Sequence, residues 1–319
     1  MMSAKHKPNE LYIERIYDAP VKAVWDAWTD PDQVAKWWGP RGFTHTTKSK
    51  DFRPGGKWIY TMHGPDGVDW PNITTYHEIV PYSRLMYDHG GNDEREALFR
   101  VTVNFIELKN NKTKMEMWMA LPTPEAAKEI GKFIKQAGGN ATWDRLAEHL
   151  EKKFSGKENF VINRTFEAPL ALVFDMFTKP EHFTKWLAPT GMNMVYLKDD
   201  IKVGDYTICK MSDGQGFTLY NKAEYKEITK PNRIVYTQQF CDEKGNIAKA
   251  PFDPNWPTTM QTTVTLTEET PTLTRVTVNW ELAGDFTQVE LETFIKERGG
   301  MTIGWTGSFD KLEEYLKNI

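Results

Sequence analysis

The chain has 319 residues, a net charge of −4 at pH 7, 12 tryptophans and 17 phenylalanines. This length predicts two domains, and the near-balanced, interspersed charge argues against nucleic acid as a partner. The polar first ten residues, the two cysteines and the lack of a long apolar stretch predict a cytoplasmic protein with neither a disulfide framework nor a membrane span.

The chain contains a long internal repeat, in which residues 12–87 recur at 161–236 after a shift of 149 positions without a gap. Ala19-Pro20, Trp37 and Tyr76, for example, return as Ala168-Pro169, Trp186 and Tyr225. Solenoids and propellers have much shorter periods, of about 20–50 residues. We therefore expect one fold that occurs twice, with domains at 9–153 and 158–319. A feature present in only one copy is a candidate for divergent function.

Each copy begins with a short strand, at 12–17 or 160–166, and an Ala-Pro then starts a helix, because proline suits the first helical turn. A second short helix is expected at Pro31 or Pro180. Runs rich in β-branched and aromatic residues follow in meander order, which indicates antiparallel pairing. In the first copy these runs are 57–62, 74–80, 84–87, 98–107 and 113–120. In the second copy they are 206–211, 219–228, 233–240, 260–267 and 274–282.

Each copy ends in a helical stretch, which follows a Gly-Gly pair at Gly138-Gly139 or Gly299-Gly300. These elements predict an α+β fold in which a curved antiparallel sheet of about six or seven strands wraps around a long C-terminal helix. The second copy has 12 additional residues near Gly245–Pro257. They could cover the mouth of a cavity or pair as an extra strand, and three prolines among them favour an ordered loop.

Several motifs match one known family. They are Ala19-Pro20, Val24-Trp25, Thr29-Asp30-Pro31 and Trp37-Trp38, their counterparts in the second copy, and the segments Phe240–Asn246, Pro254–Pro257, Gly304-Trp305 and Phe309–Leu312. On these residues, both halves resemble the family named after the activator of Hsp90 ATPase, within the START-like or SRPBCC superfamily. The resemblance implies two tandem helix-grip domains of the Bet v 1 or START-like type, each enclosing a cavity. Superfamily members are similar in shape, yet bind lipids, hormones or polyketides, catalyse cyclisation, or regulate chaperones.

The polar residues give little indication of catalysis. The seven histidines show no HxH or HxxxH spacing and no CxxC occurs, so neither a metal site nor a cofactor is expected. His63 follows Trp58 and Tyr60 at the end of a strand and could serve as an acid or base near pH 7. Cys209 aligns with Tyr60 and could be a nucleophile, although a lone buried cysteine is usually a small hydrophobe. No residue is assigned as catalytic.

Aromatic residues are the main candidates for a binding site, because rings on the strands and final helices could line a cavity for an apolar or planar ligand. Core packing would explain the same pattern, and a single bulge reverses which face a strand residue takes. With His63 and Cys209 added, the candidate lining is Trp58, Tyr60, His63, Tyr76, Trp118 and Trp143 in the first copy, and Tyr206, Cys209, Tyr225, Tyr236, Trp280 and Trp305 in the second. Trp37 and Trp186 are expected in the core.

The leading hypothesis is a non-enzymatic cytoplasmic protein that binds a small apolar or aromatic ligand between the sheet and the C-terminal helix. One alternative is a regulator of an Hsp90-type chaperone that acts through protein contacts. Another is an enzyme on a polyketide-like substrate. His63 and Cys209 differ between the copies, so we expect function to reside in one domain's cavity rather than in both.

Overall fold

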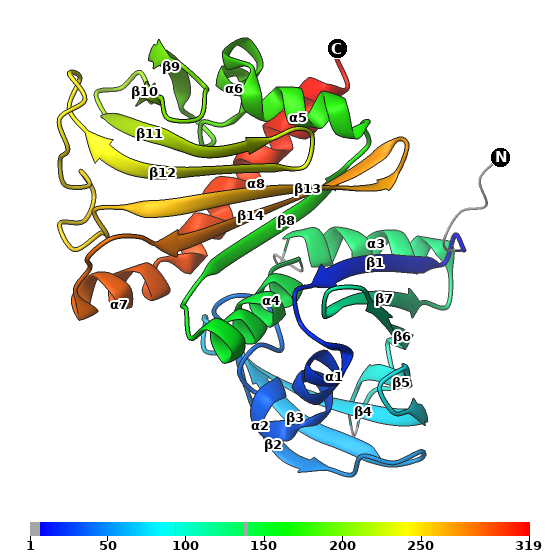
Figure 1. The fold of residues 1–319 in the computed structure, drawn as a ribbon. Helices are drawn as coiled ribbons and strands as arrows, with labels where there is room; N and C mark the ends of the chain where they lie inside the picture. The colour runs from blue at the N-terminus through cyan, green and yellow to red at the C-terminus, as the bar shows by residue number, and fades with distance from the viewer. Residues whose placement is uncertain (1–6, 93, 137–139) are drawn as a thin grey trace. The chain divides into compact units, whose positions relative to one another are not determined.

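The computed structural model describes residues 7–92, 94–136 and 140–319, and the chain divides into two compact units, Met1–Gly156 and Lys157–Ile319. Within the described residues each unit has one seven-stranded antiparallel sheet accompanied by helices, so the predicted α+β class and tandem helix-grip fold are confirmed (Figure 1). The predicted Gly138-Gly139 break lies outside the described residues. None of the helices in the described ranges is long and apolar enough to cross a membrane.

The first domain has its strands in the spatial order β1-β7-β6-β5-β4-β3-β2, so the first strand pairs with the last and the others form a meander. Its elements are β1 (Glu10–Tyr17), α1 (Val21–Thr29), α2 (Pro31–Val34), β2 (Thr44–Lys50), β3 (Lys57–His63), β4 (Asp69–Val80), β5 (Arg84–Gly91), β6 (Phe99–Leu108), β7 (Lys112–Ala120), α3 (Pro124–Gln136) and α4 (Asn140–Ser155).

The second domain repeats this order as β8-β14-β13-β12-β11-β10-β9. Its elements are β8 (Phe160–Phe166), α5 (Leu170–Thr178), α6 (Pro180–Trp186), β9 (Asn193–Asp199), β10 (Tyr206–Ser212), β11 (Thr218–Thr229), β12 (Arg233–Cys241), β13 (Met260–Thr270), β14 (Leu273–Leu282), α7 (Gln288–Lys296) and α8 (Arg298–Leu316).

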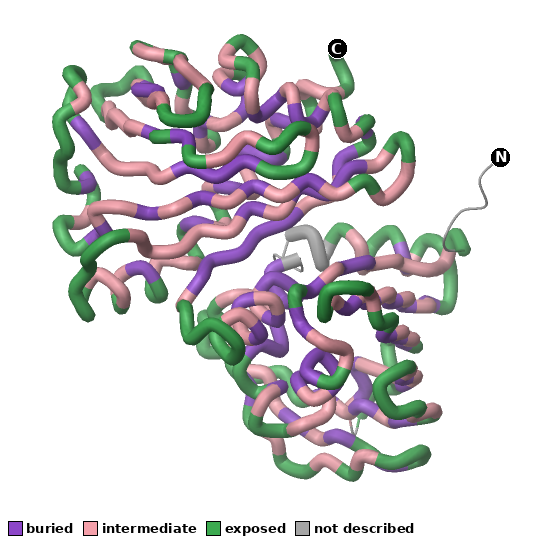
Figure 2. Tube along the Cα trace, viewed as in Figure 1, coloured by how far each residue is buried: buried purple, intermediate pink, exposed green. Residues whose placement is uncertain are grey.

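The shift of 149 positions holds in three dimensions. Tyr76 pairs with Tyr87 across β4 and β5, and Tyr225 pairs with Tyr236 across β11 and β12. A bulge follows Tyr76 and another follows Tyr225, at the same place in each sheet. Figure 2 shows that buried residues follow the strands and final helices, whereas the loops at the strand ends are exposed. Residues that correspond by sequence can therefore be compared as equivalent positions in the two domains.

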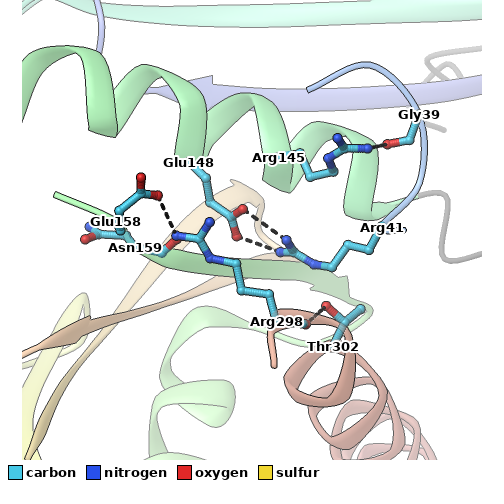
Figure 3. Close-up of polar contacts among 8 residues, drawn as sticks. All are labelled: Gly39, Arg41, Arg145, Glu148, Glu158, Asn159, Arg298 and Thr302. Carbon is cyan, nitrogen blue, oxygen red and sulfur yellow. Dashed lines mark hydrogen bonds and ion pairs between the residues drawn. The ribbon is translucent and has the colours of Figure 1, made fainter. Parts of the chain in front are cut away.

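A partly buried cation fixes each final helix to the loop that follows the second helix. Arg145 of α4 donates to the carbonyl oxygens of Gly39, Pro40 and Phe43 at 2.8, 2.8 and 3.1 Å. Figure 3 shows the bond to Gly39. Lys311 of α8 donates to the carbonyls of the equivalent residues, Ala188, Pro189 and Met192, at 2.8, 3.0 and 3.1 Å. Burial lowers the pKa of Arg145 to about 10 and also lowers the pKa of Lys311. Arg145 therefore remains charged at pH 7.

Additional ion pairs hold the two final helices in different ways. In the first domain, Arg41 donates to both carboxylate oxygens of Glu148 on α4, at 3.0 and 2.6 Å (Figure 3). In the second domain, Arg298 at the start of α8 donates to Glu158 and to the backbone carbonyl of Asn159, next to β8. The first turn of α8 is thereby anchored to its own sheet.

We predict that Arg145→Met lowers the free energy of unfolding of the first domain by about 3 kcal/mol, because three partly buried carbonyls lose their donor. Arg145→Lys should lower this free energy by only about 1 kcal/mol, since Lys311 makes the equivalent hydrogen bonds in the second domain. Urea unfolding followed by tryptophan fluorescence measures both. Equal losses for the two variants would contradict the role given to this cation.

Candidate functional site

A cavity of about 380 Å³ lies in the second domain, enclosed by the inner face of the sheet and by α8. Its volume falls in the range of small-molecule sites, about 300–1,000 Å³. Its wall combines side chains from β9 to β14 with residues of the loop after α6, of the insertion and of α8. The lining is mostly aromatic and aliphatic, with a few polar groups, as is usual for sites that bind small molecules.

Small residues on α8 contribute the helical side of the cavity. Gly300, Gly304 and Ser308 recur at intervals of four and line it beside the larger Met301 and Trp305, so this one row of the helix adds little side-chain volume. A Cβ atom added at Gly304 would meet no atom within 4 Å. The open space at this position is therefore a property of the helix sequence as well as of the sheet.

The insertion of the second copy forms part of the cavity wall. Phe252 and Trp256 both line the cavity, and their rings lie 5.3 Å apart. Phe252 also packs edge-on against Phe240 of β12 at 5.5 Å and remains 55% exposed, so it lies at the rim of the cavity. The insertion is a loop with one isolated β-bridge, between Cys241 and Ile247. Of the two roles open from the sequence, the structure assigns it a place at the cavity rather than an added strand.

The equivalent space in the first domain is filled. Among the described residues of that domain, the void at this place measures about 10 Å³, barely enough for one water molecule. Six of its nine lining positions correspond to lining positions of the large cavity, so the two spaces are equivalent. The domains thus share a backbone but differ in the volume of their interior side chains.

Large aromatic side chains occupy the space in the first domain. Trp38, Trp58 and Tyr60 stand where the second domain has Leu187, Thr207 and Cys209. The rings of Trp58 and Tyr60 stack with centroids 4.0 Å apart, and Trp38 donates from its indole nitrogen to the Tyr60 hydroxyl at 3.3 Å. Trp143 of α4 stacks on Trp28 with centroids 5.6 Å apart. These contacts complete a packed aromatic core.

Five of the six residues singled out in the second copy line its cavity, namely Cys209, Tyr225, Tyr236, Trp280 and Trp305. Tyr206 does not. Because Thr207 and Cys209 face inward, the alternation of the strand places Tyr206 on the outer face, where it packs against the ammonium groups of Lys198 and Lys222 at 4.3 and 4.5 Å. The expectation that Tyr206 lines the cavity is corrected accordingly.

The six candidates of the first copy divide into two groups. Trp58, Tyr60, Tyr76 and Trp143 are buried and belong to the core that fills the interior. Trp118 and His63 lie on the outer face of the sheet, so the expectation that they line a cavity is corrected. Trp118 packs against Tyr12 with ring centroids 5.2 Å apart, because its neighbours Met117 and Met119 take the inward positions.

His63 is exposed and takes part in a surface network. One ring nitrogen contacts the Thr46 hydroxyl at 2.9 Å and the other contacts the Asp69 carboxylate at 2.7 Å. This arrangement connects three adjacent strands on the outer face, away from the interior void. Trp37 and Trp186, which the sequence places in the core, are fully buried.

Several wall residues of the second domain were not anticipated. They are the small residues of α8, the aromatic residues of the insertion, and Asn221 and Gln238 on the inner face of the sheet. The spacing of four between Gly300, Gly304 and Ser308 was readable as a helix face without side chains. Asn221 and Gln238 share the strand alternation of Tyr225 and Tyr236, which was a usable signal for an inward position.

Burial controls the ionisation of the cavity wall. It raises the pKa of Cys209 to about 12, so this side chain is a thiol at neutral pH and a poor nucleophile. It also raises the pKa values of Tyr225 and Tyr236, which remain neutral phenols. Among the described residues, no group of three or more His, Cys, Asp or Glu side chains could hold a metal ion.

The filled interior of the first domain includes a histidine packed among aromatic rings. His89 packs against Phe99 and Trp38 with ring centroids 5.2 and 5.9 Å apart, and burial lowers its pKa to about 4. In the unfolded chain a histidine has a pKa of about 6.5. As the pH falls from 6.5 towards 4, the unfolded chain therefore takes up a proton that the folded domain excludes. The contribution of a neutral His89 to stability is lost across this window.

We predict that the first domain loses about 2 kcal/mol of unfolding free energy through His89 between pH 7.5 and pH 5. His89→Leu should remove this part of the pH dependence, because leucine does not titrate. Urea unfolding of both proteins at the two pH values measures the difference. Parallel losses in the wild type and the variant would show that His89 is not responsible.

Comparison with known proteins identifies the fold family of both domains. The family model described as activator of Hsp90 ATPase homolog 1-like protein matches residues 18–151 and again residues 167–317. None of the curated proteins searched matches the chain.

Solved structures similar to the chain include proteins that match about half of it and one that matches almost all of it. A protein from Nitrosomonas europaea is 22% identical with a TM-score of 0.43, over 47% of this chain and 99% of its own. One from Arthrobacter aurescens is 25% identical with a TM-score of 0.43, over 47% of this chain and 92% of its own. The di-domain ARO/CYC BexL from the BE-7585A biosynthetic pathway is 14% identical with a TM-score of 0.38, over 96% of this chain and 97% of its own.

The two family matches together span most of the chain, one in each domain. The protein therefore belongs to the activator of Hsp90 ATPase homolog 1-like family, and it contains two such domains in tandem.

Proposed function

We propose that the protein binds a small apolar, ring-containing molecule in the cavity of its second domain, and that its first domain is a structural copy. The observation that carries this proposal is the contrast between a cavity of about 380 Å³ and an equivalent void of about 10 Å³. Two domains with the same strand order and the same helix anchor differ mainly in whether the interior is filled. Ligand binding accounts for a space that packing alone would close.

The composition of the wall favours a ring-containing ligand. Tyr225, Tyr236, Trp256, Trp280 and Trp305 present aromatic surfaces to one space. Rings of this kind stack or pack edge-on against other rings and bury a large apolar area. The free thiols of Cys209 and Cys241 support a reducing compartment such as the cytoplasm.

The other two hypotheses have less support. His63, the candidate acid or base, is on an outer face in the domain with the filled interior. Cys209 lies in the cavity but as a thiol whose pKa burial raises to about 12. An enzyme acting inside this cavity therefore lacks both of its candidate groups. The feature that distinguishes the domains is an interior space, which favours a small ligand over a chaperone as the binding partner.

We predict that Gly304→Leu weakens binding by occupying part of the cavity. The neutral fluorescent probe N-phenyl-1-naphthylamine should bind the wild type at one site per chain, and Gly304→Leu should weaken it at least tenfold, which is about 1.4 kcal/mol. The new Cβ fits, since no atom lies within 4 Å of its position, and the branched end of the leucine then occupies the space that the probe needs. Fluorescence titration measures affinity and stoichiometry.

Gly299→Leu is the matched control, because Gly299 lies on the same helix, is exposed and does not line the cavity. Replacing either glycine removes a weak helix former, worth up to about 1 kcal/mol, so neither variant should unfold the domain. Two equivalent probe sites per chain, or equal binding by the two variants, would contradict the proposal.

A further inference from the structure

Two side-chain amides in the cavity wall are available to a ligand. Asn221 of β11 and Gln238 of β12 both line the cavity, and neither side chain hydrogen-bonds to another group in the described part of the chain. Asn221 pairs with Phe240 and Ala223 pairs with Gln238, so the two amides occupy diagonal positions on the same inner face. Each amide offers two N–H donors and a carbonyl acceptor.

These amides are not required by the fold. At the equivalent positions the first domain has Asn72 and His89. The Asn72 amide donates to the backbone carbonyl of Trp70 at 2.8 Å, and His89 is enclosed by aromatic rings. The same sheet thus forms without a free pair of amides. Of these equivalent positions, only those in the open cavity hold two amides without an intramolecular side-chain hydrogen bond in the described residues, which points to recognition of a ligand.

The charges of the wall limit the kind of ligand. The residues lining this cavity include one carboxylate, Glu297, and no Lys, Arg or His. An anion placed among the aromatic residues would lose its hydration without gaining a countercharge. A neutral molecule with a hydroxyl or carbonyl group would instead keep a hydrogen bond through the amides.

We propose that Asn221 and Gln238 form a polar anchor that selects neutral fused-ring molecules bearing a hydroxyl or carbonyl group, and that carboxylates such as fatty acids are excluded. This inference rests on the proposed ligand-binding function and specifies its ligand class. The rings of the ligand contact the aromatic wall, and its oxygen faces the two amides.

Three naphthalene compounds test this proposal by displacement of N-phenyl-1-naphthylamine from the full-length protein at pH 7. 2-Naphthol should bind about tenfold more tightly than naphthalene, because only the naphthol has a group that the amides can hydrogen-bond. 2-Naphthoate should bind at least tenfold more weakly than 2-naphthol. Binding of 2-naphthoate as tight as that of 2-naphthol would overturn the exclusion of anions.

Variants then assign the preference to the amides. Gln238→Leu and Asn221→Leu should each remove most of the advantage of 2-naphthol while retaining the affinity for naphthalene, which also shows that the cavity is intact. The control is Gln239→Leu, which removes an amide of the same size from the opposite face of β12, where it donates to Thr259. It should keep the wild-type preference.

The failure of this inference and of the proposed function give different results. If naphthalene and 2-naphthol displace the probe equally from the wild type, or if the Gln238→Leu and Asn221→Leu variants keep the preference, the polar anchor is wrong while ligand binding stands. If neither the probe nor any of the three compounds binds, the proposed function fails, and the inference fails with it.

Discussion

The partly buried cation on the final helix is the interaction on which the rest of both domains depends. Arg145 and Lys311 donate to the same three equivalent backbone carbonyls in the loop after the second helix, and Arg145 also donates to the carbonyl of Lys36. This contact sets where the helix lies against its sheet. Once helix and sheet are fixed, the space between them has a given size, and the side chains that face it decide whether it is filled or open.

The two domains use that space in opposite ways. The first fills it with Trp38, Trp58 and Tyr60, which pack against one another, and Trp38 also packs against Trp28 of α1 and Trp143 of α4. The second has smaller residues at the same three positions and small residues along α8, and an insertion adds Trp256, which is buried and packs near Phe294 of α7. A tandem duplication makes this division possible, because one copy can hold a stable core while the other keeps an open cavity.

Much of the fold could be predicted from the sequence, because most elements of one copy have a counterpart in the other copy that supports the same assignment. The helices after Ala19-Pro20 and Ala168-Pro169, the meander and the final helices all follow from local patterns. The strands β2 and β9 were missed. The sequence of β2, Thr44–Lys50, is polar on both faces and shows no alternation of apolar and polar residues. The sheet tolerates such a strand because β2 lies at its edge.

The cavity itself could not be predicted, because it depends on volumes summed over strands far apart in the sequence. For a related reason, the sequence could not predict which face of the sheet Trp118, Tyr206 and His63 occupy. Alternation along a strand assigns faces only when the register is known, and bulges such as those in the β2–β3 and β9–β10 pairings shift the register. The contrast between Tyr60 and Cys209 was visible in the alignment as a difference. Only the structure shows that this difference changes the side-chain volume in the interior rather than the chemistry of the site, because Tyr60 packs there against Trp58 and Trp38.

Xenon binding is the most direct test of the account, because xenon enters apolar cavities without specific chemistry. A crystal structure of the full-length protein under xenon pressure should show the gas between the sheet and α8 of the second domain. The equivalent place in the first domain should be empty of xenon, since its aromatic residues leave only about 10 Å³. Xenon in both domains at similar occupancy, or in neither, would contradict the claim that one domain is open and the other filled.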